Sequence, residues 1–112
     1  MGLPWIEITS VDQLHHIWNN SLTQPAVFFK HSTRCSISSM SLRAFERSWD
    51  IDDTQLFFID LIAHRDVSNL LAELSHIEHQ SPQVIVTKNN HVIYINSHGT
   101  INADKIQQLI LS

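Results

Sequence analysis

The sequence predicts an α/β protein, a three-layer α/β/α sandwich in which helices cover both faces of a mixed, four-stranded central sheet. Short apolar runs alternate along the chain with longer stretches in which apolar residues recur every three or four positions, as in amphipathic helices. Strands that alternate with helices pair in parallel through right-handed crossovers. Asn89 and Asn90 separate the last two strand-like apolar runs, which predicts that a tight turn joins these runs as an antiparallel hairpin.

The chain has the size and composition of one folded domain. Its 112 residues are enough to bury a core without help from disulfides or metal ions. Hydrophobic residues make up 43% of the sequence, which is typical of a globular protein rather than of a disordered chain. No repeat, low-complexity tract or linker interrupts it. We therefore expect a single domain over residues 1–112.

The first half of the chain supplies two helices around a buried strand. Residues 11–22 carry apolar side chains at helical spacing, with Ser10 as a suitable N-cap. Residues 26–29 form an apolar run typical of a strand that is buried on both faces. A polar loop over residues 31–34 leads to a second helix, which begins at Cys35. The residues of this helix that we expect to face the core are Ile37, Met40, Ala44, Phe45 and Trp49.

The second half continues the alternation and ends with the hairpin and a helix. Pro82 stands directly before one of the apolar runs, and Asn102 is a suitable N-cap for the last helix. Residues 5–8 could add a short extra strand at an edge of the sheet. In chain order, the remaining elements are a strand over residues 56–59, a helix over 67–74, strands over 84–86 and 92–95, and a helix over 103–110.

The charge balance argues against several kinds of partner. The formal net charge is −4 and the isoelectric point is about 6.0, whereas a general nucleic-acid binder is usually basic. The 7 Lys and Arg residues are too few for a polybasic membrane patch. The sequence has neither the apolar run of about 20 residues that a transmembrane helix needs nor the features of a signal peptide. We therefore expect a cytoplasmic protein that binds neither nucleic acid nor membranes.

The 8 histidines raise the question of a metal site, but their spacing does not support one. His76 and His79 are three positions apart, and His15 and His16 are adjacent. Neither pair has a companion ligand at the spacing that zinc sites use. We therefore expect surface histidines and no bound metal.

Cys35 is the only cysteine, so the chain cannot form an internal disulfide. A lone cysteine is either an inert, buried side chain or a reactive thiol. Arg34, Ser36 and Ser38 make the neighbourhood of Cys35 polar, which favours an exposed thiol. The predicted helix begins at this residue, so the chemistry of a helix start applies to it.

A helix start stabilises a thiolate. The first turn leaves backbone N–H groups without intrahelical partners, and these groups carry a partial positive charge. A thiolate is therefore favoured over a thiol at this position. Ser38, three residues after Cys35, can present its backbone N–H and its hydroxyl to the sulfur. Arg34 adds a neighbouring cation, whose effect we expect to be weak because the side chain is exposed.

Pro82 is the second informative residue. A proline cannot donate to the hydrogen-bond ladder of a central strand, so we expect it at the start of that strand. In this topology the strand starts beside the helix that carries Cys35. The local sequence favours an ordinary trans bond, since only about one X–Pro bond in twenty is cis. A cis Ser81–Pro82 bond would instead aim the backbone groups of Ser81 toward a docked substrate.

Residues 28–38, which read Phe-Phe-Lys-His-Ser-Thr-Arg-Cys-Ser-Ile-Ser, resemble the active-site segment of the monothiol bacilliredoxins, the YtxJ-like branch of the thioredoxin-fold proteins. The signature of that family reads close to K-H-S-T-x-C-P-I-S and is followed downstream by S-P-Q before a strand. Ser81, Pro82 and Gln83 match the second element, and residues 5–17 resemble the family's opening segment. One departure is Ser36, which stands where the family often has a proline that pre-organises the first helical turn.

The resemblance implies a fold similar to thioredoxin and glutaredoxin. It makes Cys35 the nucleophile, places Ser38 where dithiol relatives keep a resolving cysteine, and makes Pro82 a cis-proline. Thr33, Arg34 and Ser36 would support the thiolate, and Ser81 and Pro82 would bind substrate. The implied substrates are proteins that carry a mixed disulfide with bacillithiol, the small thiol that replaces glutathione in some bacteria. Bacillithiol would act as co-substrate rather than as a bound cofactor, and a dithiol reductase could be a further partner.

Two other functions stay open at this point. Monothiol glutaredoxins that carry iron–sulfur clusters also keep one cysteine and a serine, but their site reads C-G-F-S where this chain has Cys-Ser-Ile-Ser at residues 35–38. A non-catalytic binding module is the other alternative, because a fold alone does not imply chemistry.

Overall fold

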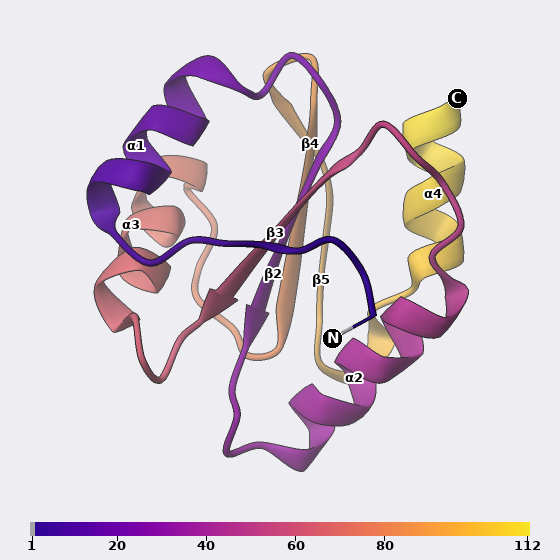
Figure 1. The fold of residues 1–112 in the computed structure, drawn as a ribbon, viewed down its shortest axis with the longest axis horizontal. Helices are drawn as coiled ribbons and strands as arrows, with labels where there is room; N and C mark the ends of the chain where they lie inside the picture. Colours follow the sequence, from indigo (N-terminus) through magenta and orange to yellow (C-terminus); the bar gives the residue numbers. More distant parts are fainter. Residues whose placement is uncertain (1) are drawn as a thin grey trace.

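A computed structural model describes residues 2–112, so Met1, the first residue of the predicted domain, lies outside the described residues. The structure is an α/β/α sandwich with a five-stranded mixed sheet, and Figure 1 shows helices on both of its faces. The predicted fold class is confirmed, and the extra N-terminal strand is present. The elements are β1 (Ile6–Glu7), α1 (Val11–Asn20), β2 (Ala26–His31), α2 (Ser36–Ser48), β3 (Gln55–Asp60), α3 (Arg65–Ser75), β4 (Gln83–Lys88), β5 (His91–Ser97), the 3-10 turn η1 (His98–Thr100) and α4 (Ala103–Leu111).

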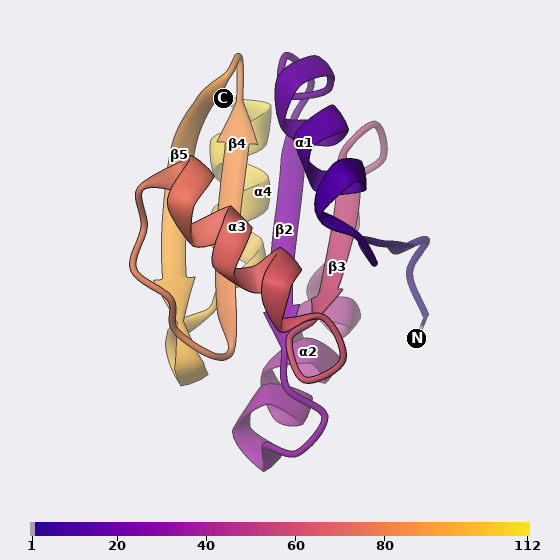
Figure 2. The ribbon, with the colours of Figure 1, turned by 90° about the vertical axis from the view of Figure 1, so that its left-hand side faces the viewer.

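The strand order in the sheet is β1-β3-β2-β4-β5. Strands β1, β3 and β2 run parallel, whereas β4 runs antiparallel to both β2 and β5. Strand β2 is therefore the central strand, and all 6 of its residues are buried. The C-terminal end of β2 lies beside the start of β4, as Figure 2 shows.

Side chains of β2 alternate between two separate cores, as the pleat of a strand requires. Phe28 packs on the face covered by α1 and α3, where its ring stacks on Phe57 with centroids 5.1 Å apart. Phe29 packs on the opposite face, covered by α2 and α4, where its ring meets Phe45 edge to face at 5.6 Å. A strand that is buried on both faces needs apolar residues in succession rather than an alternating pattern.

The predicted caps and turn are confirmed. Ser10 accepts a hydrogen bond from the backbone of Gln13 at the start of α1, and Asn102 accepts one from Lys105 at the start of α4. Asn89 and Asn90 both have positive φ, at 54° and 65°, as a tight turn between β4 and β5 requires. Helix α1 is shorter than the predicted range of residues 11–22, because the chain turns after Asn20.

The predicted apolar face of α2 was partly wrong. Ile37 is 51% exposed and Met40 is 64% exposed. Apart from Phe45, the side chains of α2 that are buried are Ser38 and Leu42. Positions 38, 42 and 45 form one stripe at helical spacing, but its first member is a serine. The apolar pattern of the sequence therefore indicated the neighbouring stripe, which is exposed at Ile37 and Met40.

None of the helices in residues 2–112 combines the length and the apolar character that crossing a membrane requires.

The two stripes of α2 predict opposite responses to truncation. Leu42→Ala should lower the free energy of unfolding by about 2–4 kcal/mol, because it opens a cavity against β2 and α4. Met40→Ala, two residues earlier in the same helix, should change it by less than about 0.5 kcal/mol, because the side chain is exposed. Urea unfolding of both variants checks this, and equal losses would contradict the described orientation of α2.

Candidate active site

The thiol of Cys35 lies at the start of α2. Strand β2 ends at His31, residues 32–34 form a short loop, and Cys35 is the N-cap of the helix. Its backbone N–H donates to the carbonyl of Ser32 at 3.2 Å, and its carbonyl accepts from the N–H of Ser39 at 3.1 Å. These two bonds fix the backbone on both sides of the thiol. Cys35 is half-buried, so the thiol is neither a core residue nor fully exposed.

Ser38 lies beneath this loop and is fully buried. Its hydroxyl oxygen accepts the N–H of Ser32 at 3.0 Å and shares a hydrogen bond of 2.7 Å with Nδ1 of His31. The hydroxyl was expected to face the sulfur, but its hydrogen bonds go to His31 at the end of β2 and to Ser32 at the start of the loop. The side chain of Cys35 makes no capping bond to α2. A role for Ser38 in stabilising the thiolate stays a prediction.

His31 is a buried residue of β2, although the sequence placed it in the polar loop. Its side chain is 7% exposed and its ring lies 5.5 Å from that of Phe58. Burial lowers the pKa of His31, and the charge of Asp60 on β3 opposes that shift. The ring is therefore neutral near pH 7 and available as a hydrogen-bond partner.

The remaining predicted residues of the thiol segment flank Cys35 on the surface. Thr33, Arg34 and Ser36 are all exposed. Arg34 therefore sits where the sequence placed it, as a solvated cation next to the thiol.

Pro82 reaches the same end of the sheet from β4. Gln83 pairs with Lys30 of β2, so the next residues along the two strands are Pro82 and His31. The Ser81–Pro82 bond is cis, as the family resemblance implies and contrary to the expectation from the local sequence. The carbonyl of Pro82 accepts a bond from the backbone of His98 at 2.8 Å. The loop that carries Ser81 and the loop that carries Cys35 therefore open toward the same side.

Lys30 is buried on the other face of β2, which the sequence did not reveal. Its side chain has 0% exposure, and its Nζ donates to Nδ1 of His79 at 3.2 Å. The hydroxyl of Ser68 also lies 3.3 Å from Nδ1 of His79. Burial lowers the pKa of Lys30 to about 8. Burial, followed by the charges of Lys30 and Arg65, also lowers the pKa of His79.

The histidines do not all lie on the surface as predicted, because His31 is buried and His79 is half-buried. Within residues 2–112, no group of three or more His, Cys, Asp or Glu side chains is placed to hold a metal ion.

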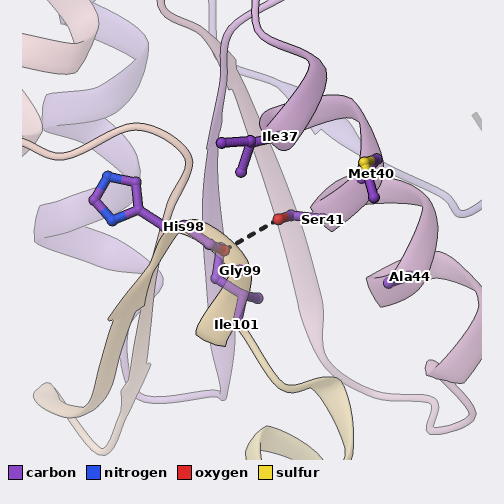
Figure 3. Close-up of a pocket in the computed structure, with 7 residues that line it drawn as sticks. All are labelled: Ile37, Met40, Ser41, Ala44, His98, Gly99 and Ile101. Atoms are coloured by element: carbon purple, nitrogen blue, oxygen red, sulfur yellow. Dashed lines mark hydrogen bonds between the residues drawn. The ribbon is translucent and has the colours of Figure 1, made fainter.

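An apolar groove with a volume of about 460 Å³ lies between α2 and η1. Figure 3 shows Ile37 and Met40 on one wall and the hydrogen bond from the hydroxyl of Ser41 to the carbonyl of His98. Ile37 follows Cys35 by two residues, so the groove lies near the start of the helix that Cys35 caps. The residues that line it are Ile37, Met40, Ser41, Ala44, His98, Gly99 and Ile101.

Comparisons with known proteins agree with this arrangement. The family model described as monothiol bacilliredoxin BrxC matches residues 6–106. A candidate oxidoreductase with a thioredoxin fold is 25% identical, with a TM-score of 0.76, over 94% of this chain and 92% of that one. Thioredoxin from Trypanosoma brucei brucei is 13% identical, with a TM-score of 0.74, over 99% and 91% of the two chains. Malassezia sympodialis thioredoxin is 18% identical, with a TM-score of 0.70, over 99% and 90%. The two thioredoxins show the fold alone, and the thioredoxin-like fold is confirmed.

The buried Lys30 predicts a stability that depends on pH. Its pKa is about 8 in the folded chain and about 10.4 in the unfolded chain, so the folded state is penalised fully below pH 8. The penalty disappears as the pH rises to about 10.4. Lys30→Met should therefore stabilise the protein at pH 7 by about 1–3 kcal/mol, and this gain should shrink between pH 8 and 10. Urea unfolding across that range measures it.

Lys105→Met, at an exposed position of α4, is the matched control and should show no such trend. A Lys30→Met variant that is less stable than the parent at pH 7 would mean that the bond to His79 outweighs the burial of the charge.

Proposed function

The chain belongs to the monothiol bacilliredoxin family, and from that premise we propose that it removes bacillithiol from mixed disulfides on cytoplasmic client proteins. The observation that carries the proposal is the placement of the only cysteine. Cys35 is half-buried at the N-cap of α2, beside the backbone N–H groups of the first helical turn, which have no partners within the helix. The loop with the cis Ser81–Pro82 bond opens toward the same side.

The reaction is a thiol–disulfide exchange. The thiolate of Cys35 attacks the bacillithiol sulfur of the client's mixed disulfide. A new disulfide forms between Cys35 and bacillithiol as the bond to the client sulfur breaks. The client leaves as a thiolate and takes a proton from solvent. The client is thereby reduced, and Cys35 carries the bacillithiol.

Regeneration needs a second molecule, because the chain has no other cysteine. A second bacillithiol thiolate attacks the bacillithiol sulfur bound to Cys35, which releases bacillithiol disulfide and restores the Cys35 thiolate. A dithiol reductase could carry out the same step and take up the oxidising equivalent as its own disulfide. Bacillithiol is thus a co-substrate in this scheme.

The residues around Cys35 take supporting roles in the proposal. The backbone of Ser81 would align the incoming disulfide by strand-like pairing at the start of β4. Arg34 would add a weak, solvent-screened attraction for the thiolate. Thr33 and Ser36 complete the exposed surface on either side of the thiol.

The apolar groove between α2 and η1 suits a protein substrate. A client must place its modified cysteine next to Cys35, so the residues that flank that cysteine reach the neighbouring surface. Ile37 and Met40 expose apolar area there that a client side chain would cover. We therefore assign the groove to the client polypeptide rather than to bacillithiol.

Transfer of bacillithiol to Cys35 is the first expected outcome. Intact-mass analysis of a mixture with a bacillithiolated client should show the client freed and the protein heavier by one bacillithiol. Cys35→Ser should leave the client modified, because a hydroxyl is not a nucleophile for disulfides at neutral pH. A glutathionylated client, run in parallel, should react far more slowly.

If neither small thiol moves to Cys35, the proposal fails. Purification under anaerobic, iron-replete conditions then separates the two other functions. A coloured protein would indicate an iron–sulfur carrier, and a colourless one whose biological effect survives Cys35→Ser would indicate a binding module.

The groove assignment predicts an effect that depends on the substrate. Met40→Ser should raise KM for a bacillithiolated protein by roughly three- to tenfold, because an apolar contact is lost. It should leave the rate with a small bacillithiol disulfide unchanged. Asn69→Ser, an exposed change on α3 across the sheet, is the matched control. Equal effects of Met40→Ser on both substrates would contradict a client-binding groove.

A further inference from the structure

The loop over residues 76–82 joins α3 to β4 and carries Ser81 (Figure 2). His79, two residues before Ser81, is fastened both to the sheet and to α3. Nζ of Lys30 on β2 donates to Nδ1 of His79 at 3.2 Å, and the hydroxyl of Ser68 on α3 lies 3.3 Å from the same nitrogen. The bond from Lys30 therefore ties this loop to the central strand of the sheet.

A second hydrogen bond fastens the residue before His79. Nε2 of Gln83, the first residue of β4, donates to the carbonyl of Glu78 at 3.0 Å. Gln83 pairs with Lys30 in the sheet, and the side chains of directly paired residues lie on the same face. Lys30 is 0% exposed and Gln83 is 2% exposed. Two neighbouring buried side chains, one from each strand, thus hold two consecutive residues of the loop.

The bond between Lys30 and His79 has one direction at pH 7. Burial lowers the pKa of Lys30 to about 8, so the side chain is mostly an ammonium, which donates and cannot accept. Nδ1 of His79 must then accept, which places the ring hydrogen on Nε2. Burial, followed by the charges of Lys30 and Arg65, lowers the pKa of His79 and keeps the ring neutral near pH 7. The ring is therefore in the form that accepts from the ammonium.

Stability does not explain why a lysine occupies position 30. The lowered pKa of Lys30 means that folding disfavours its charged form, which destabilises the folded chain at pH 7. An apolar side chain of similar length is expected to give a more stable protein, as predicted above for Lys30→Met. Groups that are kept although they lower stability are most often found at functional sites. What Lys30 holds is the loop that carries Ser81.

We propose that Lys30 and His79 are positioning residues, which hold the loop over residues 76–82 so that the backbone of Ser81 meets an incoming disulfide at the start of β4. They act through the loop and touch neither the substrate nor the thiol. The inference rests on the proposed function in assigning Ser81 to the substrate. Its first tests therefore use the chain without any substrate.

Local proteolysis measures how firmly the loop is held. A protease that cuts after glutamate reaches Glu78 when the loop opens. Lys30→Met removes the ammonium without changing residues 76–82, so cleavage after Glu78 at pH 7 should become about tenfold faster. Cleavage after Glu46, within α2, reports general unfolding and should not become faster. Lys105→Met, at an exposed position of α4, is the matched control and should change neither rate.

Two results on the substrate-free chain would overturn the proposal. One is a rate of cleavage after Glu78 that Lys30→Met leaves unchanged or raises only as much as the rate after Glu46. The other concerns the ring of His79 in protein labelled with 15N at histidine, because the chemical shifts of the ring nitrogens show which of them carries the hydrogen. A hydrogen on Nδ1 at pH 7 would mean that Lys30 does not donate to this ring.

Kinetics with a bacillithiolated client test the step from the loop to the substrate. His79→Leu should lower kcat/KM about tenfold, because Ser81 is no longer held in place. Alkylation of Cys35 by iodoacetamide, which needs no alignment by Ser81, should change by less than about twofold. His79→Gln should recover most of the rate, since its amide oxygen can accept from Lys30. Gln80→Leu, an exposed change in the same loop, is the matched control.

A double substitution tests whether the two residues act together. In a Lys30→Met background, His79→Leu should lower kcat/KM by less than about a further twofold, because the bond is already lost. Full additivity of the two substitutions overturns the proposal. An equal fall in the client reaction and in alkylation of Cys35 also overturns it, because His79 would then act on the thiol rather than on the loop.

The outcomes separate this proposal from the proposed function. If the parent protein transfers no bacillithiol, the proposed substrate fails, and selective cleavage after Glu78 in Lys30→Met still supports the hold of Lys30 on the loop. If the parent transfers bacillithiol and Lys30→Met cleaves no faster after Glu78, the proposed function stands and the positioning role fails.

Discussion

The burial of β2 on both faces is the constraint on which the rest of the structure depends. Because this central strand serves two cores at once, it must be apolar for most of its length, and helices must cover each face of the sheet. The loop with Cys35 follows the end of β2, and Pro82 precedes the start of β4. These two strand ends are neighbours because β4 runs antiparallel to β2, so both residues lie at the same end of the sheet. Ligands of α/β proteins commonly bind beyond the carboxyl ends of the strands.

The last two residues of β2 depart from its apolar pattern. Lys30 and His31 are both buried, and each meets its own polar partners on a different face of the sheet. Their hydrogen bonds offset part of the cost of burying such groups, and the cost that remains for Lys30 is expressed in its lowered pKa. The departure occurs where the strand meets the thiol loop, and local rules of folding are most often broken at functional positions.

Much of this arrangement could be predicted from the sequence, because its signals are local. Apolar periodicity gave the order of the elements, and Ser10, Asn102 and the Asn89–Asn90 pair mark ends that short-range hydrogen bonds and backbone angles define. The face of α2 and the burial of Lys30 could not be predicted in this way. Ser38 is buried because residues before the helix satisfy its hydroxyl, and the partner of Lys30 is His79, 49 positions away.

The two edge strands of the sheet determine how readily another molecule can pair with it. An unpaired strand edge is a template on which a second molecule can add a strand, and this is a common route to aggregation. At one edge β1 has only 2 residues, so it offers little continuous backbone. At the other edge the β4–β5 ladder has an irregularity at Val86 and Thr87, and such interruptions twist an edge away from regular pairing. The short β1 at one edge and the irregular ladder at the other therefore make both edges of this sheet poor templates for a strand from a second molecule.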